Sequence, residues 1–197
     1  QYPNDAHLLL LLAEYYKRTD NDTLYQQYTL DAIKTTDIAT TKAIQLTRPF
    51  IAGYLHENDS TALNQIIEHL NTVYPNNIDV LELQAEIYKS QQDTLRWKQT
   101  LYKIREQKTD DAIDFELIKI SEAQNNKEEL IKLAKEGYQK FNTDKWAFFY
   151  IISLLQNEQT DTLLNESFQI LPSITTPHFK SKIYQIVGNT YSLLNND

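Results

Sequence analysis

The feature that most constrains the fold is a tripeptide, Asp-Thr-Leu, which occurs at residues 22–24, 93–95 and 161–163. The copies are 71 and 68 residues apart, and looser versions lie near the two midpoints, at residues 59–63 ("DSTAL") and 126–130 ("NKEEL"). The five copies begin at residues 22, 59, 93, 126 and 161, so the steps are 37, 34, 33 and 35 residues. A period this regular predicts a stacked array of short structural repeats.

Apolar residues follow the first four copies at spacings of three and four, which places them on one face of a helix. They are Leu24, Tyr25, Tyr28, Ala32 and Ile33; Leu63, Ile66, Ile67 and Leu70; Leu95, Trp97, Leu101, Tyr102 and Ile104; and Leu130, Ile131, Leu133, Ala134 and Tyr138. We expect the Asp or Asn that opens each copy to cap the N-terminus of this helix. The Leu of the tripeptide would then begin the buried stripe.

A second helical pattern precedes the copies, as in "LLLAEYY" (10–16), "LELQAEIY" (81–88) and "YQIVGNTY" (184–191). It resembles the first helix of the tetratricopeptide (TPR) repeat, whose pattern is W-x2-L-G-x2-Y and whose length is 34 residues. The resemblance covers essentially the whole chain. It implies that small residues (Ala13, Ala85 and Gly188) lie at close helix crossings and that tyrosines (Tyr16, Tyr88 and Tyr191) fill the space beside them. Other families of solenoid built of helical hairpins stay as alternatives to the TPR family.

The resemblance implies an all-α fold, a right-handed α-solenoid of antiparallel helix pairs. We expect one array over residues 1–197, with repeats at about 4–37, 38–75, 76–109, 110–142 and 143–172 and a terminal helix at 177–194. Pro49 lies inside one first helix, so a kink or a late start is expected there. "QYPND" at residues 1–5 echoes "VYPNN" at 73–77, and Asp197 falls where the next copy is due. These ends suggest a fragment of a longer bacterial TPR protein; alternatively, the last helix is a solvating cap.

The composition fits a helical interaction protein and excludes several classes. Three Gly and five Pro in 197 residues favour long helices, and the net charge of −8 argues against nucleic-acid binding and against attachment to anionic membranes. Acidic character favours cationic or neutral partners. The longest uncharged apolar run, residues 147–155, is too short to insert into a membrane as a span.

No motif for catalysis, metal or cofactor binding emerges. The three Gly are isolated, so no phosphate cradle is expected, and Cys is absent. The four His are scattered, and the zincin-like start His56-Glu57 fails because Ser60 stands where the second His belongs. We therefore expect no catalytic residue, no metal site and no cofactor. An enzyme on a helical array stays an alternative, and its mark would be strongly shifted carboxylates in one pocket.

The resemblance also implies that the first helices line a concave face that binds a peptide or partner protein. Helical geometry assigns these residues to that face: His7, Leu10, Glu14, Arg48, Glu82, Glu86, Phe115, Lys119, Ile151, Leu155, Gln185 and Asn189. The face is acidic in its middle and apolar toward its C-terminal half. Either a partner or another helix of the array would cover the apolar part.

The sequence thus favours a non-enzymatic protein–protein interaction scaffold, with a regulatory or sensor segment of a larger envelope or signalling protein as the alternative. Its oligomeric state is left open. The tripeptide also resembles the O-glycan acceptor pattern of certain bacterial envelope proteins, with Thr23, Ser60, Thr94 and Thr162 as acceptors. Residues 21–23, 58–60 and 165–167 match the Asn-x-Ser/Thr sequon as well. These patterns favour the periplasmic side of a bacterial envelope over the cytoplasm, while capping explains the tripeptide without any modification.

Overall fold

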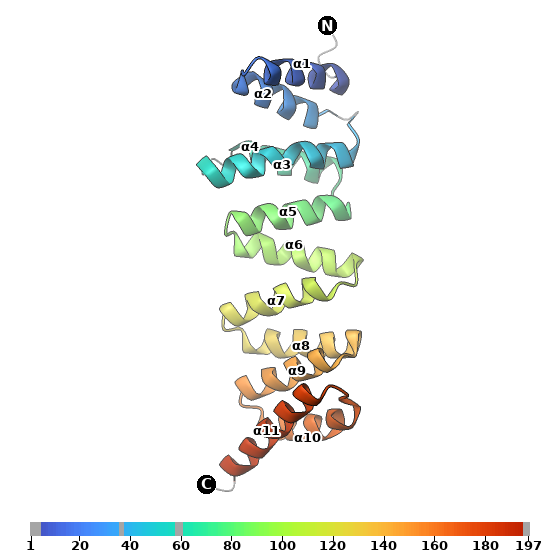
Figure 1. The fold of residues 1–197 in the computed structure, drawn as a ribbon, viewed down its shortest axis with the longest axis vertical. Helices are drawn as coiled ribbons and strands as arrows, with labels where there is room; N and C mark the ends of the chain where they lie inside the picture. Colours follow the sequence, from blue (N-terminus) through green and yellow to red (C-terminus); the bar gives the residue numbers. More distant parts are fainter. Residues whose placement is uncertain (1–4, 36–37, 58–60, 195–197) are drawn as a thin grey trace. The chain divides into compact units, whose positions relative to one another are not determined.

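The computed structural model describes residues 5–35, 38–57 and 61–194, and of residues 53–57 and 62 it describes the backbone alone. Within these ranges the regular structure consists of eleven α-helices and one short 3-10 helix, with no strand. The chain divides into two compact units, residues 1–107 and 108–197. Each unit is described by itself below (Figure 1).

The N-terminal unit contains six helices, in which consecutive helices pack as pairs. They are α1 (Ala6–Arg18), α2 (Asp22–Ile33), α3 (Thr40–Glu57), α4 (Thr61–Val73), α5 (Ile78–Ser90) and α6 (Thr94–Gln107). The pairs are α1 with α2, α3 with α4 and α5 with α6; in addition, α3 packs on α5 and α2 packs on α4.

The C-terminal unit contains five α-helices. They are α7 (Asp111–Ala123), α8 (Lys127–Phe141), α9 (Asp144–Gln156), α10 (Thr160–Ile170) and α11 (Pro177–Leu194), and the 3-10 helix η1 (Leu171–Ser173) follows α10. Here α7 pairs with α8 and α9 with α10, while α8 also packs on α9, and α11 packs on both α9 and α10.

The chain is an all-α protein of the α-solenoid class, built from antiparallel helix pairs (Figure 1). Each repeat range expected from the sequence holds two of these helices, and the range 177–194 holds α11. The exact division into repeats stays a prediction. We call α1, α3, α5, α7 and α9 the first helices and their partners the second helices.

Two of the second helices begin with the expected cap. Asp93 Oδ1 accepts a hydrogen bond from Arg96 N at 2.9 Å, and Asn126 Oδ1 accepts one from Glu129 N at 3.2 Å. Each bond satisfies a backbone N–H group that has no partner within the first helical turn. The capping prediction is confirmed for α6 and α8.

The same prediction is wrong for α2 and α10. In α2 the cap is Asn21, whose Oδ1 accepts from Leu24 N at 3.2 Å, so Asp22 is already the first helical residue. In α10 the helix begins at Thr160 and its N-cap, Gln159, makes no side-chain cap bond. Asp161 is therefore inside the first turn, where its charge favours the positive end of the helix. The copy at residue 59 lies outside the described residues.

Most of the predicted packing stripe is buried. In α4, Leu63, Ile66, Ile67 and Leu70 all belong to the core of the N-terminal unit, as expected. Of the predicted stripe residues, Leu95 alone is exposed, at 66%, because it follows the cap of α6 by only two residues and faces outward, whereas Leu24 and several aromatic residues are half-buried.

The close-contact prediction is wrong for Gly188, since a Cβ built there meets no atom within 4 Å. The close approach is at Gly137 of α8 instead, where a Cβ would lie closer than 3.0 Å to three ring carbons of Trp146 in α9. Ala13 and Ala85 are buried as expected. Helix α3 begins at Thr40 and runs through Pro49, so the late start considered there is also wrong.

Candidate functional site

A hollow of about 450 Å³ lies on the N-terminal unit where two first helices, α3 and α5, pack against each other. We call it the α3–α5 hollow. Its lining residues are Thr41, Ile44, Gln45 and Arg48 from α3 and Asp79, Glu82, Leu83 and Glu86 from α5. Every lining residue thus comes from a first helix.

The helical repeat places the polar lining residues on one side of each helix. Thr41, Gln45 and Arg48 are four and three residues apart, and the three acidic residues of α5 follow the spacing of three and four. Asn77 fixes the start of α5, because its Oδ1 accepts hydrogen bonds from Asp79 N at 3.0 Å and Val80 N at 3.2 Å. The acidic side chains therefore begin at the first turn of the helix.

Apolar side chains form the floor of the hollow. Leu83 is buried, with 3% of its surface exposed, and Ile44 is half-buried, whereas the polar lining residues Arg48, Glu82 and Glu86 are exposed. A partner side chain that enters the hollow can therefore bury methylene groups against the floor and meet charged groups at the rim.

The charge of the hollow is negative. Asp79, Glu82 and Glu86 contribute three carboxylates and Arg48 contributes one guanidinium. Arg48 Nη1 lies 3.5 Å from Glu86 Oε2, and their side chains are 62% and 48% exposed. A pair this exposed stabilises the fold by only about 0–1 kcal/mol and is screened by salt. A partner can therefore displace this pair at little cost, and the negative charge of the lining favours a cationic partner.

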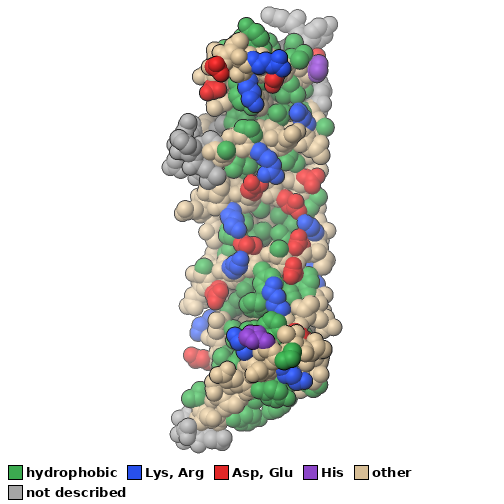
Figure 2. Space-filling view, in the orientation of Figure 1, with side chains coloured by type: hydrophobic (Ala, Val, Ile, Leu, Met, Phe, Trp, Pro, Cys, Tyr) green, Lys and Arg blue, Asp and Glu red, His purple; other side chains and the backbone are tan. Residues whose placement is uncertain are grey.

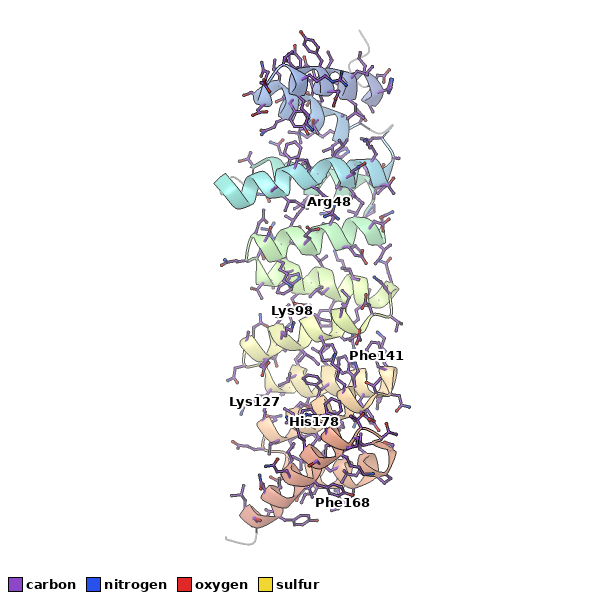
Figure 3. All side chains as sticks on the ribbon, viewed as in Figure 1. Arg48, Lys98, Lys127, Phe141, Phe168 and His178 are labelled. Carbon is purple, nitrogen blue, oxygen red and sulfur yellow. The ribbon has the colours of Figure 1, made fainter. Side chains whose placement is uncertain are left out.

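Figures 2 and 3 show the region of the α3–α5 hollow from the same side. Figure 2 shows acidic side chains gathered over the region of α3 and α5. Figure 3 labels Arg48 on the side of α3 that is turned toward α5. The structure thus brings together three of the twelve residues that the sequence assigned to partner binding, namely Arg48, Glu82 and Glu86.

The residues assigned on α1 lie apart from this hollow. His7 and Glu14 are exposed and Leu10 is half-buried. Glu14 Oε1 accepts a hydrogen bond from Arg18 Nε at 3.0 Å, which is an ordinary pair within one helix. Their role in partner binding stays a prediction.

In the C-terminal unit, Phe115 belongs to an aromatic stack. Its ring centroid lies 4.3 Å from that of Trp146, and the Lys145 ammonium lies 3.7 Å from the Phe115 centroid. Lys119 is exposed, and its Nζ lies 3.2 Å from Glu116 Oε1. A ring held this way is better explained by packing than by a partner that stacks on it.

The assignment of Ile151 to partner binding is wrong. The residue is fully buried, because α9 packs against α8, α10 and α11, so Ile151 cannot contact a partner on the surface. Leu155, one turn further on, is exposed and lines a second hollow of about 270 Å³ together with Leu163, Leu193 and Leu194. Gln185 and Asn189 on α11 are exposed, and neither is among the lining residues of the α3–α5 hollow.

Three of the four expected O-glycan acceptors are exposed, namely Thr23, Thr94 and Thr162. Exposure is required of an acceptor, and glycosylation stays a prediction. Ser60 lies outside the described residues.

The sequence-based assignment missed Thr41, Gln45 and Asp79 in the lining of the hollow. A signal existed for two of them, since Gln45 and Asp79 lie one helical turn before Arg48 and Glu82, whereas Thr41 lies two turns before Arg48. The floor residues Ile44 and Leu83 carried no such signal, because apolar residues at those positions also fit a packing stripe.

The described residues hold no group of three or more His, Asp or Glu side chains that could bind a metal ion. Burial and the nearby Lys34 lower the pKa of His69, and its Nε2 is buried without a hydrogen-bond partner. The lining residues of the α3–α5 hollow include no His, and its three carboxylates are exposed at the surface. Among the described helices, none is long and apolar enough to span a bilayer.

These observations define the class of the chain, an all-α helical-repeat protein whose first helices form a charged hollow over an apolar floor. No protein-family model matches the chain, and no curated protein matches it. Among solved structures, the crystal structure of yeast Tom70 is similar over 98% of this chain and 41% of that chain, with 12% sequence identity and a TM-score of 0.46. This chain therefore spans less than half of the Tom70 chain, and its class rests on its own helices and their packing.

Proposed function

We propose that the chain is an array of TPR-type repeats that acts as a non-enzymatic protein-interaction scaffold and binds a basic peptide or a basic helix of a partner protein in the α3–α5 hollow. One observation carries the proposal: three carboxylates and a displaceable Arg48–Glu86 pair surround an apolar floor on the face formed by first helices. Each lysine or arginine of the partner would place its methylene groups on Leu83 and Ile44 and its charge beside Glu82 or Asp79.

The arrangement favours binding over catalysis. The three carboxylates line a hollow at the surface and are exposed, so solvent screens their charges. Catalytic acids and bases usually lie in buried sites that shift their pKa values strongly. Open carboxylates over an apolar floor are instead typical of a surface that recognises cationic side chains.

The test uses two fluorescein-labelled helical peptides of equal length and equal apolar content, one carrying Lys and the other carrying Glu at the same positions. Fluorescence anisotropy measures the binding of each peptide to the whole chain at low and high salt. We expect the Lys peptide to bind, its affinity to fall as salt is raised, and the Glu peptide to bind far more weakly.

The decisive variant is the double change Glu82→Lys and Glu86→Lys, which inverts the charge of the hollow. Loss of two attractive contacts predicts at least about a tenfold weaker affinity for the Lys peptide, since tenfold corresponds to only 1.4 kcal/mol. The matched control is Glu68→Lys and Glu106→Lys, on exposed positions of the second helices α4 and α6. If the control weakens binding as much as the hollow variant, the effect is the net charge alone and the site is wrong.

A further inference from the structure

Aromatic rings follow one another across three helices of the C-terminal unit. The ring centroid of Phe115 in α7 lies 5.0 Å from that of Phe149 in α9. Phe148 precedes Phe149 in the chain, with 6.4 Å between the two centroids, and lies 5.4 Å from Phe179 at the start of α11. All four phenylalanines are half-buried, so part of each ring meets solvent and can contact a partner.

Two lysines lie over this row of rings. Lys145 Nζ is 3.7 Å from the ring centroid of Phe115. Lys182 Nζ is 5.7 Å from the ring centroid of Phe148. Both lysines are exposed, and within the described part of the chain neither pairs with a carboxylate. An ammonium group held over a ring keeps its positive charge, so it can still bind a carboxylate of a partner. We call these two lysines and the four phenylalanines the Lys–Phe surface.

Helices α9 and α11 carry a positive charge, although the chain as a whole has a net charge of −8. Together they contain three lysines and one acidic residue, Asp144. Asp144 Oδ2 accepts hydrogen bonds from Thr175 N at 3.1 Å and Thr176 N at 2.7 Å, so groups of the chain itself already satisfy it. On α7, Glu116 Oε1 lies 3.2 Å from Lys119 Nζ. The Lys–Phe surface is therefore a basic region of an acidic protein, and its charge favours an acidic partner.

The Lys–Phe surface is open with the neighbouring helices of α9 in place. Helices α8, α10 and α11 pack against α9, and Phe115 of α7 stacks on Trp146 of α9. Beside all four helices, Lys145 stays exposed and Phe148 stays half-buried. Figure 2 shows a histidine of this unit beside hydrophobic side chains and a lysine or arginine, and Figure 3 labels it as His178, at the start of α11. The side of α9 that bears Lys145 and Phe148 is therefore a surface that its neighbours in the array leave uncovered.

We propose that the Lys–Phe surface binds an acidic peptide segment of a partner protein, and that this segment carries aromatic residues. The ammonium groups of Lys145 and Lys182 each pair with a carboxylate of the segment. Aromatic side chains of the segment contact the exposed parts of Phe149 and Phe179, in the edge-to-face arrangement that aromatic rings prefer. The chain then offers two binding surfaces of opposite charge, one in each unit.

A nucleic acid fits the Lys–Phe surface less well, although aromatic rings and lysines are also what single-stranded nucleic acids bind. Proteins of that kind offer open ring faces on which successive bases stack. Here lysine ammonium groups lie over the rings of Phe115 and Phe148. The net charge of −8 also repels a chain of phosphates.

The test uses two flexible fluorescein-labelled peptides of equal length, one built of Glu, Gly and Phe and the other with Leu in place of every Phe. Fluorescence anisotropy measures the binding of each peptide to the whole chain at low and high salt. We expect the Phe peptide to bind and its affinity to fall as salt is raised. The Leu peptide should bind several-fold more weakly, because it lacks the ring contacts. A labelled single-stranded oligonucleotide of equal length should bind more weakly than the Phe peptide.

The decisive variant is the double change Lys145→Glu and Lys182→Glu, which should weaken binding of the Phe peptide at least about tenfold. Lys145→Met with Lys182→Met keeps most of each apolar side chain over its ring and removes the charge, so it should weaken binding as well. The matched control is Lys127→Glu and Lys132→Glu, on exposed positions of the second helix α8, which changes the net charge by the same amount as the decisive variant. It should change the affinity little. All these side chains are exposed, so circular dichroism should show the same helix content for every variant.

Two crossed measurements separate this surface from the α3–α5 hollow. Glu82→Lys with Glu86→Lys should not weaken binding of the acidic Phe peptide. Lys145→Glu with Lys182→Glu should not weaken binding of the basic helical peptide that tests the hollow. Either site can therefore fail in these measurements while the other is supported.

Three results would overturn the proposal. Absence of binding by the Phe peptide would show that the surface does not recognise acidic segments. Equal losses in the decisive variant and in the Lys127 and Lys132 control, or full binding by the methionine variant, would show that the charges of Lys145 and Lys182 are not used. An oligonucleotide that binds more tightly than the peptide, and that loses affinity in the decisive variant, would assign the surface to nucleic acids.

Discussion

The close approach at Gly137 gives the sharpest stability prediction. A Cβ at this position would lie closer than 3.0 Å to the Cζ3, Cε3 and Cη2 carbons of Trp146, a separation that real Cβ atoms do not show. The indole has little room to give way, because it is 1% exposed and stacks against Phe115 at 4.3 Å and Phe141 at 5.3 Å between ring centroids. Gly137→Ala must therefore move the Trp146 ring or push α8 away from α9.

The size of the effect follows from two opposing contributions. Alanine favours a helix interior over glycine by about 1 kcal/mol. Overpacking of a filled core costs about 1–3 kcal/mol, and three ring contacts place Gly137 at the upper end. We expect Gly137→Ala to lower the free energy of unfolding by about 2 kcal/mol. Gly188→Ala is the matched control, because its Cβ meets nothing and helix propensity should stabilise the chain by about 0.5–1 kcal/mol.

The assay is urea denaturation followed by tryptophan fluorescence in dilute solution. The chain has two tryptophans, so a Trp97→Phe background leaves Trp146 as the only reporter and confines the signal to the C-terminal unit. The expected result is a lower urea midpoint for Gly137→Ala and a slightly higher one for Gly188→Ala. If both alanine variants shift the urea midpoint in the same direction, the argument that a Cβ at residue 137 clashes with the Trp146 ring is refuted.

Two further predictions concern acidic residues. Asp93→Ala removes the α6 cap and should lower the free energy of unfolding by about 1 kcal/mol. Asp161→Ala removes no cap and should lower it by less than half of that amount. Thermal unfolding followed by circular dichroism measures both variants, and equal losses would contradict the capping assignment. Hydrogen bonds from Thr176 and Thr175 hold the pKa of Asp144 below its ordinary value, so its charge stabilises the fold above that value and the stabilisation is lost as the pH falls through the lowered pKa. Asp144→Asn should therefore lower the thermal midpoint at pH 7 and converge with the parent in strong acid, and a constant difference at every pH would refute the linkage.

The helices were predictable from the sequence because each needs only local information. Spacings of three and four residues define a buried stripe, and polar or turn-forming residues separate one helix from the next. Part of the α3–α5 hollow was predictable for the same reason, since Arg48, Glu82 and Glu86 point away from that stripe on neighbouring first helices. What spacing cannot tell is whether the outward side of a helix meets solvent or another helix.

Ile151 and Gly137 show this limit. Ile151 occupies an outward position by its spacing, yet three other helices enclose α9 and the residue is buried. The signal was composition, since α9 carries no charge from Trp146 to Gln156. Gly137 is a close-contact residue only because the large indole of Trp146 comes from the next helix, and no pattern within α8 reveals that neighbour.

The tripeptide itself marks the repeat without setting the helix start. Its Leu is the second helical residue in α6, the third in α2 and the fourth in α10, since these helices begin at Thr94, Asp22 and Thr160. Successive residues point about 100° apart around a helix of 3.6 residues per turn, so each step turns the Leu toward a different side. Accordingly Leu95 is exposed, Leu24 is half-buried and Leu163 is buried. The same tripeptide therefore lies at three different positions relative to the start of its helix. Its recurrence reflects the period of the array, and the residues around each copy determine which residue caps the helix and which is buried.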